Sequence, residues 1–365
     1  MTEVRAKDPT PRILVVRPDR IGDVVLSTPV LEVLRRHYSK GHITFMVREL
    51  VAPLVRGLSS VDEVFIYEPD GAHRGVGGFF KLVSDIRARK IQVGIVLHSH
   101  WKIAAALFVA GVAHRVGPLS KLHSYFFYNR GVRQRRSQVE MHEADYGIQL
   151  LRKIGVRVGT RNVPTAVAVS PEARAEARAF LSGAGWDGAQ PLIAVHPGMG
   201  GSALNWPENH FFELIRRLLV EGKGVLVTAG PAEGEILVQV EKLLGSGPNR
   251  PILFGGARAG TVENLAAVLS WSSVVVAPST GPLHIAVALG KPVVTFFPPI
   301  RVQSAVRWGP YLSDESRASV LVPDVYCGRD FTCAGNRCHY FPCMKSLTVV
   351  QALEQVQAQL NRSEY

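Results

Sequence analysis

Cysteine is scarce in this sequence of 365 residues and is confined to one short stretch. The four cysteines are Cys327, Cys333, Cys338 and Cys343, so a disulfide framework that runs through the whole chain is excluded. Their spacing lacks the C-x2-C pairs of ordinary zinc sites. Free or structural thiols are therefore the first interpretation, ahead of a metal clip and then a disulfide.

Long apolar runs are missing as well. The longest strongly apolar stretch, residues 103–113, is far shorter than the ~20 residues that span a bilayer. The first ten residues are polar and contain no apolar signal segment. We therefore expect a soluble, cytoplasmic protein.

Acidic residues are outnumbered by basic ones, which gives a net charge of +12 and a pI of about 9.8. Such a balance favours nucleic acid, anionic lipid or phosphorylated substrates as partners, although it also fits a basic, solvated surface. Lys and Arg are spread along the chain, and their densest cluster is Arg130, Arg133, Arg135 and Arg136. The cluster has few aromatic neighbours and no nucleic-acid motif is recognised. A nucleic-acid-binding protein is thus an alternative, but we expect no nucleic acid partner.

Apolar residues are abundant, and strand-like and helix-like segments alternate along the chain. In the first half we predict strands at 13–17, 43–47, 61–67 and 93–97, and helices at 24–37, 79–89, 102–110 and 139–154. A linker follows at 155–170. In the second half we predict strands at 192–196, 224–228, 252–254, 274–277 and 293–297, and helices at 207–221, 233–244, 262–271, 283–289 and 348–360. This pattern predicts an α/β protein with two doubly wound, Rossmann-like domains that face a central cleft.

The domain boundaries follow from this alternation. We expect a first domain at residues 1–165 and a second at 166–345. A C-terminal helix at 346–365 completes the chain, with packing back on the first domain as one option. In doubly wound sheets ligands bind beyond the carboxyl ends of the strands.

One polar segment directly follows the first predicted strand. It contains Arg17, Arg20, Gly22 and Asp23 and lacks the G-x-G-x-x-G dinucleotide fingerprint. Asp23 is suited to be the N-cap of the next helix. A carboxylate at such a place is also suited to accept a proton, and the two roles are compatible.

Three further segments follow strands in the second half. The segment from His196 to Asn205 has three glycines in four positions, which allows close backbone approach to a phosphate. Gly230 and Glu233 lie in the second segment, where the carboxylate suits a ribose or simply the first turn of a helix. The third segment runs from Ser279 to His284, and its helix start could hold a diphosphate or be an ordinary cap. His284 alone is more typical of a hydrogen-bonded core histidine.

Together these segments resemble glycosyltransferase family 9, the ADP-heptose:lipopolysaccharide heptosyltransferases. The resemblance covers nearly the whole chain. It rests on Arg20-Ile21-Gly22-Asp23 with the following Val-Val-Leu-Ser-Thr-Pro, on His196-Pro197-Gly198 with Asn205-Trp206-Pro207, and on Ser279-Thr280-Gly281-Pro282-Leu283-His284.

The resemblance implies a GT-B fold with an acceptor-binding first domain and a donor-binding second domain. It implies inverting transfer of a heptose from ADP-heptose to a lipopolysaccharide precursor, with Asp23 as general base, and peripheral contact with the inner face of the inner membrane. The implied donor-binding residues are Ser202, Asn205, Gly230, Glu233, Gly260, Thr261, Ser279, Thr280, Gly281, Pro282 and His284. The implied acceptor-binding residues are Arg20, Gly22, Arg130 and Arg133.

No Asp-x-Asp motif is present, and His98-Ser99-His100 is the only His-x-His. The resemblance therefore implies a reaction without a metal or other cofactor, in which helix N-termini and cations hold the leaving diphosphate.

Two positions depart from the family pattern. Leu204 occupies a place where many members have Lys or Arg, and Ser279 one where many have Asp. Arg17 or Arg20 is a candidate to replace the missing cation. A GT-B transferase or epimerase that uses a UDP-sugar is therefore an alternative.

Overall fold

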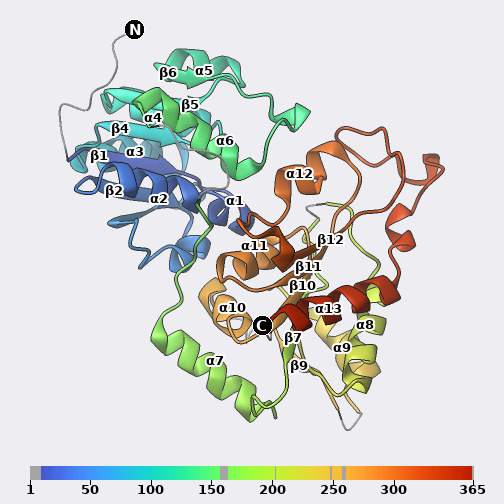
Figure 1. The fold of residues 1–365 in the computed structure, drawn as a ribbon. Coiled ribbons are helices and arrows are strands. Elements are labelled where there is room, and N and C mark those ends of the chain that lie inside the picture. Colours follow the sequence, from blue (N-terminus) through green and yellow to red (C-terminus); the bar gives the residue numbers. More distant parts are fainter. Residues whose placement is uncertain (1–9, 157–162, 202, 247–248, 257–259, 364–365) are drawn as a thin grey trace. The chain divides into compact units, whose positions relative to one another are not determined.

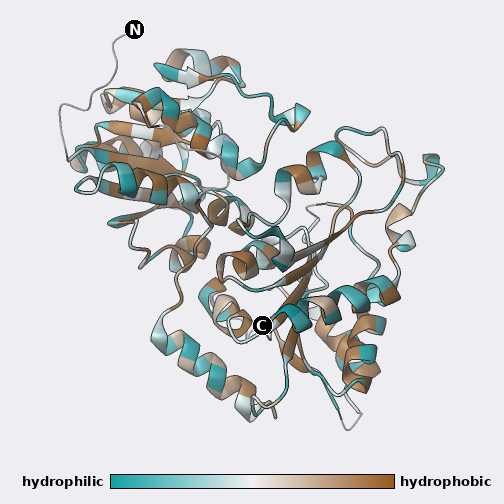
Figure 2. Cartoon of the chain, in the orientation of Figure 1, coloured by the Kyte–Doolittle hydropathy of each residue, from teal (hydrophilic) through white to brown (hydrophobic). Residues whose placement is uncertain are grey.

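The computed structural model describes residues 10–156, 163–201, 203–246, 249–256 and 260–363, and Figure 1 shows their fold. The chain divides into two compact units. The first comprises Met1–Arg136 and Glu140–Ala168, and the second comprises Ser137–Val139 and Val169–Tyr365. Each unit has its own parallel sheet, whose strands are predominantly hydrophobic (Figure 2).

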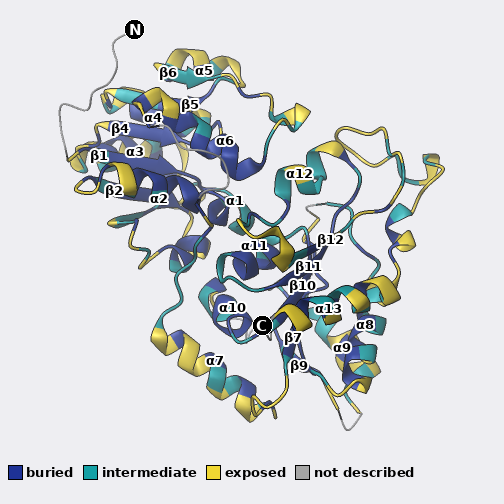
Figure 3. Ribbon diagram, viewed as in Figure 1, coloured by how far each residue is buried: buried dark blue, intermediate teal, exposed yellow. Residues whose placement is uncertain are grey.

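Six parallel strands form the sheet of the first unit, in the order β3-β2-β1-β4-β5-β6. The strands are β1 (Arg12–Val16), β2 (His42–Val47), β3 (Glu63–Ile66), β4 (Val93–Val96), β5 (His114–Pro118) and β6 (Arg130–Val132). The helices are α1 (Ile21–Val25), α2 (Thr28–His37), α3 (Gly75–Ala88), α4 (Trp101–Val109), α5 (Leu122–Phe127) and α6 (Glu143–Leu150). β1 is an inner strand of the sheet, and its residues 13–16 are buried on both faces, as Figure 3 shows.

The single helix predicted for residues 24–37 is two helices, α1 and α2. Pro29 lies in the first turn of α2 and has no N–H to donate to the carbonyl of Val25. The hydroxyl of Thr28 donates to that carbonyl instead (2.7 Å), and the hydroxyl of Ser27 donates to the carbonyl of Asp23 (2.7 Å). The break therefore confines Asp23 to a helix of only five residues.

The second unit repeats the design with six parallel strands in the order β12-β11-β10-β7-β8-β9. The strands are β7 (Leu192–Val195), β8 (Gly224–Thr228), β9 (Ile252–Phe254), β10 (Val274–Pro278), β11 (Val293–Phe296) and β12 (Ala318–Leu321). The helices are α7 (Pro171–Gly183), α8 (Glu208–Val220), α9 (Gly234–Leu244), α10 (Val262–Leu269), α11 (Gly281–Ala288), α12 (Ala305–Trp308) and α13 (Val349–Ser363). Trp206 anchors the core: its ring stacks on Phe296 with centroids 4.1 Å apart, and its indole N–H donates to the carbonyl of Leu347 (2.8 Å).

The final helix, α13, belongs to the second unit, which corrects the option that it packs on the first domain. Ala352, Val356 and Leu360 share one apolar cluster with residues of α8, β10 and β11. The apolar residues of this helix are thus buried against its own unit.

Several elements are missing from the sequence-based prediction or shorter than predicted. The sequence-based prediction lacks β5, α5 and β6 in the first unit and α7 and β12 in the second. The helix predicted at 139–154 begins only at Glu143, because Val139 adopts a positive φ of 52° and His142 supplies the N-cap.

No helix in the described part of the chain is both long enough and apolar enough to cross a membrane.

Candidate functional site

In each unit one group of candidate residues lies where the strand order reverses. β1 lies beside β4 in the first sheet, and the chain continues from them in opposite directions along the sheet. β7 and β10 have the same relation in the second sheet. A crevice at the carboxyl ends of such strand pairs is the usual ligand site of doubly wound sheets.

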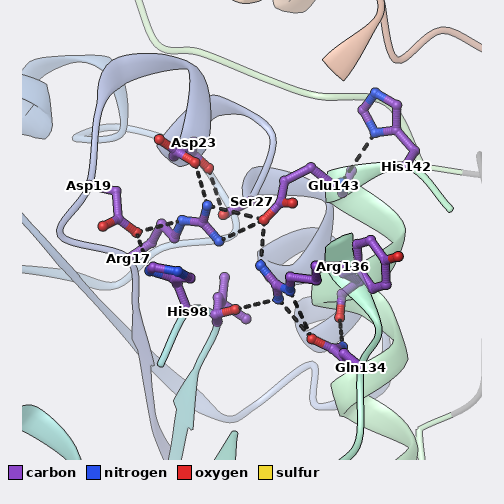
Figure 4. Close-up of polar contacts among 12 residues, drawn as sticks. Arg17, Asp19, Asp23, Ser27, His98, Gln134, Arg136, His142 and Glu143 are labelled. Atoms are coloured by element: carbon purple, nitrogen blue, oxygen red, sulfur yellow. Dashed lines mark hydrogen bonds and ion pairs between the residues drawn. The ribbon is translucent and has the colours of Figure 1, made fainter. Parts of the chain in front are cut away.

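A buried arginine is the centre of the first group. Arg17 follows β1, is 4% exposed and contacts three carboxylates (Figure 4). Its Nε lies 2.8 Å from Oδ2 of Asp19, and its Nη2 lies 3.2 Å from Oε1 of Glu143 and also pairs with Oδ1 of Asp23. Three residues from separate turns of the chain are thus fixed around one guanidinium.

A second arginine supports the same carboxylate from the other side. Arg136 pairs with Oε1 of Glu143 and donates to the carbonyl of Leu97 (2.7 Å), at the end of β4. It also donates to the amide oxygen of Gln134. Glu143, whose side chain is 2% exposed, therefore bridges the carboxyl ends of β1 and β4 through two arginines.

The charges of this group oppose the effect of burial. Burial alone would lower the pKa of Arg17, but Asp23, Glu143 and Asp19 outweigh it and raise the pKa above its ordinary value. The pKa of His98, which follows β4, is lowered by burial and by the charge of Arg17. The group therefore keeps Arg17 charged beside its carboxylates and favours a neutral His98.

Asp23 is not the N-cap of its helix. Arg20 occupies the cap position without a side-chain cap bond, and Asp23 lies within the first turn of α1. The side chain of Asp23 is 18% exposed, so it remains partly open to solvent while Arg17 holds one of its oxygens. This is the geometry of an oriented, accessible carboxylate.

The expected acceptor residues do not form one group. Arg20 is exposed and Gly22 half-buried, and both lie beside Asp23 in the chain. Arg130 begins β6 and is directed elsewhere: it donates to Nδ1 of His114 (3.2 Å) and to the carbonyl of Lys153 (3.1 Å). Because His114 begins β5, Arg130 points toward the amino ends of the strands, away from Arg17. Arg133 is exposed beyond β6.

The second group surrounds His196, which follows β7. Its Nδ1 lies 2.9 Å from the hydroxyl of Thr228 on β8, and its Nε2 lies 3.6 Å from Oε2 of Glu233. Burial lowers the pKa of His196 to about 4, against the smaller opposite effect of Glu233. The histidine is therefore neutral at pH 7 and acts as a hydrogen-bonding support for the loop.

Glu233 is packed tightly between two glycines. Its Oε2 accepts a hydrogen bond from the backbone N–H of Gly230 (2.8 Å). A Cβ added to Gly198 would lie 2.0 Å from the same oxygen. A side chain at Gly198 would therefore have to displace the carboxylate of Glu233.

The Gly-rich loop ends in two residues with different environments. Asn205 donates from Nδ2 to the carbonyl of Pro197 (2.9 Å) and closes the loop. Leu204, at the place of a cation in many family members, packs its side chain against the apolar core of the unit. Ser202, a predicted phosphate residue, lies outside the described residues.

The remaining donor candidates follow β9 and β10. Thr261 and Asn264 form a capping box at the start of α10, and Gly260 precedes them with a φ of 55°. Thr280 is the N-cap residue of α11 but makes no side-chain cap bond there. Ser279, Gly281 and Pro282 lie beside it, and His284 is buried. Taken together, the donor candidates of the second unit follow four strands that are neighbours in the sheet: β9, β8, β7 and β10.

The hypothesis that Arg17 replaces the missing phosphate cation is not supported, because three carboxylates already surround it. Sequence reasoning missed Asp19, Gln134 and Glu143 as members of this group. Asp19 and His98 carry a usable signal, since each directly follows an end of β1 or β4. Glu143 carries none, because it lies 126 residues from its partner Arg17.

The four cysteines are free thiols. Together with Leu204 they line one small pocket in the loop before α13. Among the described residues, no three His, Cys, Asp or Glu side chains are arranged to hold a metal ion.

Comparison with known proteins places this geometry in a family. Residues 79–333 match the model of glycosyltransferase family 9 (heptosyltransferase). A Haemophilus influenzae protein, provisionally named a glycosyltransferase, is 29% identical over 82% of this chain and 86% of its own length.

Two solved structures have the same fold. The family 9 glycosyl transferase of Veillonella parvula superposes with a TM-score of 0.84 at 23% identity, over 97% of this chain and 98% of the other. The Escherichia coli ADP-heptose lps heptosyltransferase II gives 0.77 at 20% identity, over 97% and 100%. The GT-B class predicted from the sequence is thereby confirmed. The chain belongs to glycosyltransferase family 9, and it is a glycosyl-transferring enzyme.

Proposed function

We propose that this enzyme moves a heptose from ADP-heptose to the inner core of a lipopolysaccharide precursor, with Asp23 as the general base. The observation that carries the base assignment is the oriented, partly open carboxylate of Asp23 beyond the carboxyl end of β1. The donor and acceptor are supported by the E. coli relative, whose name includes ADP-heptose and lipopolysaccharide.

The chemistry requires a base at the acceptor. An acceptor hydroxyl must lose its proton as its oxygen attacks the anomeric carbon of the donor, and a positioned carboxylate takes that proton. In this proposal Arg17 and Glu143 are positioning residues. Arg17 holds Oδ1 of Asp23 and leaves the other carboxylate oxygen for the acceptor.

The second unit supplies the donor site in this proposal. The start of α11 presents backbone N–H groups, and Thr280 leaves its hydroxyl out of the cap bond. These groups suit a diphosphate, whose negative charge increases as it leaves, and no metal is required of them. Glu233 binds the ribose in this proposal.

We place the enzyme in the cytoplasm, in peripheral contact with the inner face of the inner membrane, where lipid-linked acceptors would be met. The second candidate donor is a UDP-sugar. It is favoured by the apolar packing of Leu204 and by Ser279, which leave the second unit without two charges common in the family.

The decisive experiment is a transfer assay with ADP-heptose, ADP-glucose and UDP-sugars on truncated lipopolysaccharide acceptors. We expect transfer from ADP-heptose, and Asp23→Asn should lower kcat by about 10²–10⁴-fold while ADP affinity and thermal stability persist.

Asp19→Asn is the matched control, because it removes another carboxylate partner of Arg17 without touching the proposed base. It should reduce kcat far less than Asp23→Asn. Equal losses in both variants would make Asp23 a member of the ion-pair network only. Transfer from a UDP-sugar alone would contradict the proposed donor but would leave the assignment of Asp23 as base intact.

A further inference from the structure

An apolar surface is exposed on α5 of the first unit. Leu122, Tyr125 and Phe126 are 77%, 58% and 71% exposed. Their spacing places them on one side of the short helix, which Figure 3 shows with exposed residues along it. Large apolar residues grouped in this way mark interaction sites more often than scattered ones do.

The opposite side of α5 is fixed to the unit. Ser124 is fully buried, and its hydroxyl lies 3.0 Å from that of Ser99, which follows β4. Nε2 of His123 lies 2.9 Å from the same Ser99 hydroxyl. Arg115 donates from Nε to the carbonyl of Phe127 (2.8 Å) and closes the end of the helix. The outer apolar residues are therefore presented on an anchored helix.

The neighbouring helix α4 extends the apolar surface. Phe108 is 51% exposed, and its ring centroid lies 5.9 Å from that of Phe127. Arg115 also covers the Phe108 ring, with its Cζ 5.2 Å from the centroid. Exposed apolar residues thus lie on two helices that pack together, and Arg115 contacts both of them.

The part of the chain that carries this surface is rich in positive charge. Between Asp85 and Glu140 the chain contains ten Lys and Arg residues and no acidic residue. Lys121 directly precedes α5 and is exposed, as are Arg133 and Arg135 beyond β6. Exposed apolar residues with exposed cations near them in the chain match the interface of an anionic bilayer.

We propose that α5 and α4, with Leu122, Tyr125, Phe126 and Phe108, dock the enzyme on a membrane rich in anionic lipid. The inference rests on the proposed function, since it identifies the surface for that peripheral contact. Leu122 and Phe126 enter the headgroup–acyl boundary, and Lys121 binds lipid phosphate. The exposed aliphatic side chain of Leu122 favours lipid over single-stranded RNA, whose bases would stack on aromatic residues.

The test is sedimentation of the full chain with phosphatidylcholine vesicles, with or without phosphatidylglycerol, at low and high salt. We expect binding only to the anionic vesicles, weakened by salt. Leu122→Ser with Phe126→Ser should weaken vesicle binding by at least about tenfold. The matched control is Val238→Ser with Leu243→Ser on α9, which are 69% and 59% exposed. That control should bind like the wild type.

Three results would overturn the proposal: no preference for anionic vesicles, undiminished binding by the α5 variant, or tighter binding of RNA that is lost in the same variant. Circular dichroism of the variants excludes loss of folding as the cause. The transfer assay is independent of this test. Asp23→Asn should still bind vesicles, and the α5 variant should still use a water-soluble acceptor, so each proposal can fail alone.

Discussion

The two units share one fold design and differ completely in charge. Residues 1–168 contain 26 Lys and Arg against 14 Asp and Glu, whereas residues 169–365 contain 16 of each. The whole net charge of +12 therefore belongs to the first unit. Lys and Arg occur in both units, as the sequence indicates, but only in the second unit do acidic residues balance them.

The groups at the two reversal points also differ in charge. In the first unit the group consists of ionised side chains around Arg17. In the second it consists of glycine-rich loops and helix starts, and its central histidine is neutral. The comparison teaches that one fold can build a site from side-chain charges or from backbone groups. In our proposal the first suits proton transfer, and the second suits holding a diphosphate.

Removal of Arg17 tests the group of ionised side chains in the first unit. Of the changes considered, it should have the largest effect on free energy. Arg17→Met leaves Asp23 and the buried Glu143 without their shared cation, and the cost should be about 3–5 kcal/mol of the unfolding free energy. Urea denaturation measures it. Addition of Asp23→Asn should recover part of the loss, since Asp23 loses its arginine in Arg17→Met whereas Glu143 keeps its pair with Arg136.

The matched control is Arg36→Met, which breaks an exposed i,i+4 pair with Glu32 and should cost below about 0.5 kcal/mol. If Arg17→Met costs no more than this control, the buried network does not stabilise the first unit.

A change of pH tests the group around the neutral His196 in the second unit. The pKa of His196 is about 4 in the folded protein, below its ordinary value of about 6.5 in an unfolded chain. Between these values the unfolded chain binds more protons, so stability falls as the pH falls. From pH 6.5 to 4.5 this group should cost about 2 kcal/mol. Unfolding of the wild type and of His196→Asn across that range measures it, and parallel curves would contradict the assignment.

Gly198→Ala should have the smallest effect. The new Cβ must displace the carboxylate of Glu233, which we expect to weaken ADP binding by about tenfold, or about 1.4 kcal/mol. Calorimetric titration with ADP measures the change. Gly183→Ala is the control, since a Cβ there meets nothing within 4 Å. Unchanged affinity in Gly198→Ala would show that the Gly198–Glu233 contact is not needed for the donor.

The sequence predicts the buried strands of both sheets well, because β1, β4, β7 and β10 are continuous apolar runs. It predicts the edges poorly. β6 is only three half-buried residues, and β5 begins with His and Arg, so neither has the pattern of a buried strand. The break between α1 and α2 could be read from Pro29, whose missing N–H interrupts the helix.

The candidate site is predictable only in part, for a related reason. Positions such as Asp23, Gly198 and Thr280 lie in the segments that follow strands, so local sequence identifies them. The partner residues that define the chemistry of these positions are not identified by local sequence. Glu143 reaches Arg17 across 126 residues, and the carboxylate that excludes a side chain at Gly198 comes from another strand end. Such contacts depend on tertiary packing, which a single sequence does not display.

The buried position of Trp206 and the exposed position of Trp101 have a practical consequence. Trp206 is 1% exposed and stacks on Phe296 in the second unit, whereas Trp101 is 61% exposed at the start of α4 in the first. Their fluorescence should therefore differ, with blue-shifted emission from Trp206 and red-shifted, readily quenched emission from Trp101. With the other three tryptophans replaced, one spectrum could follow the core of one unit and the surface of the other in the same sample.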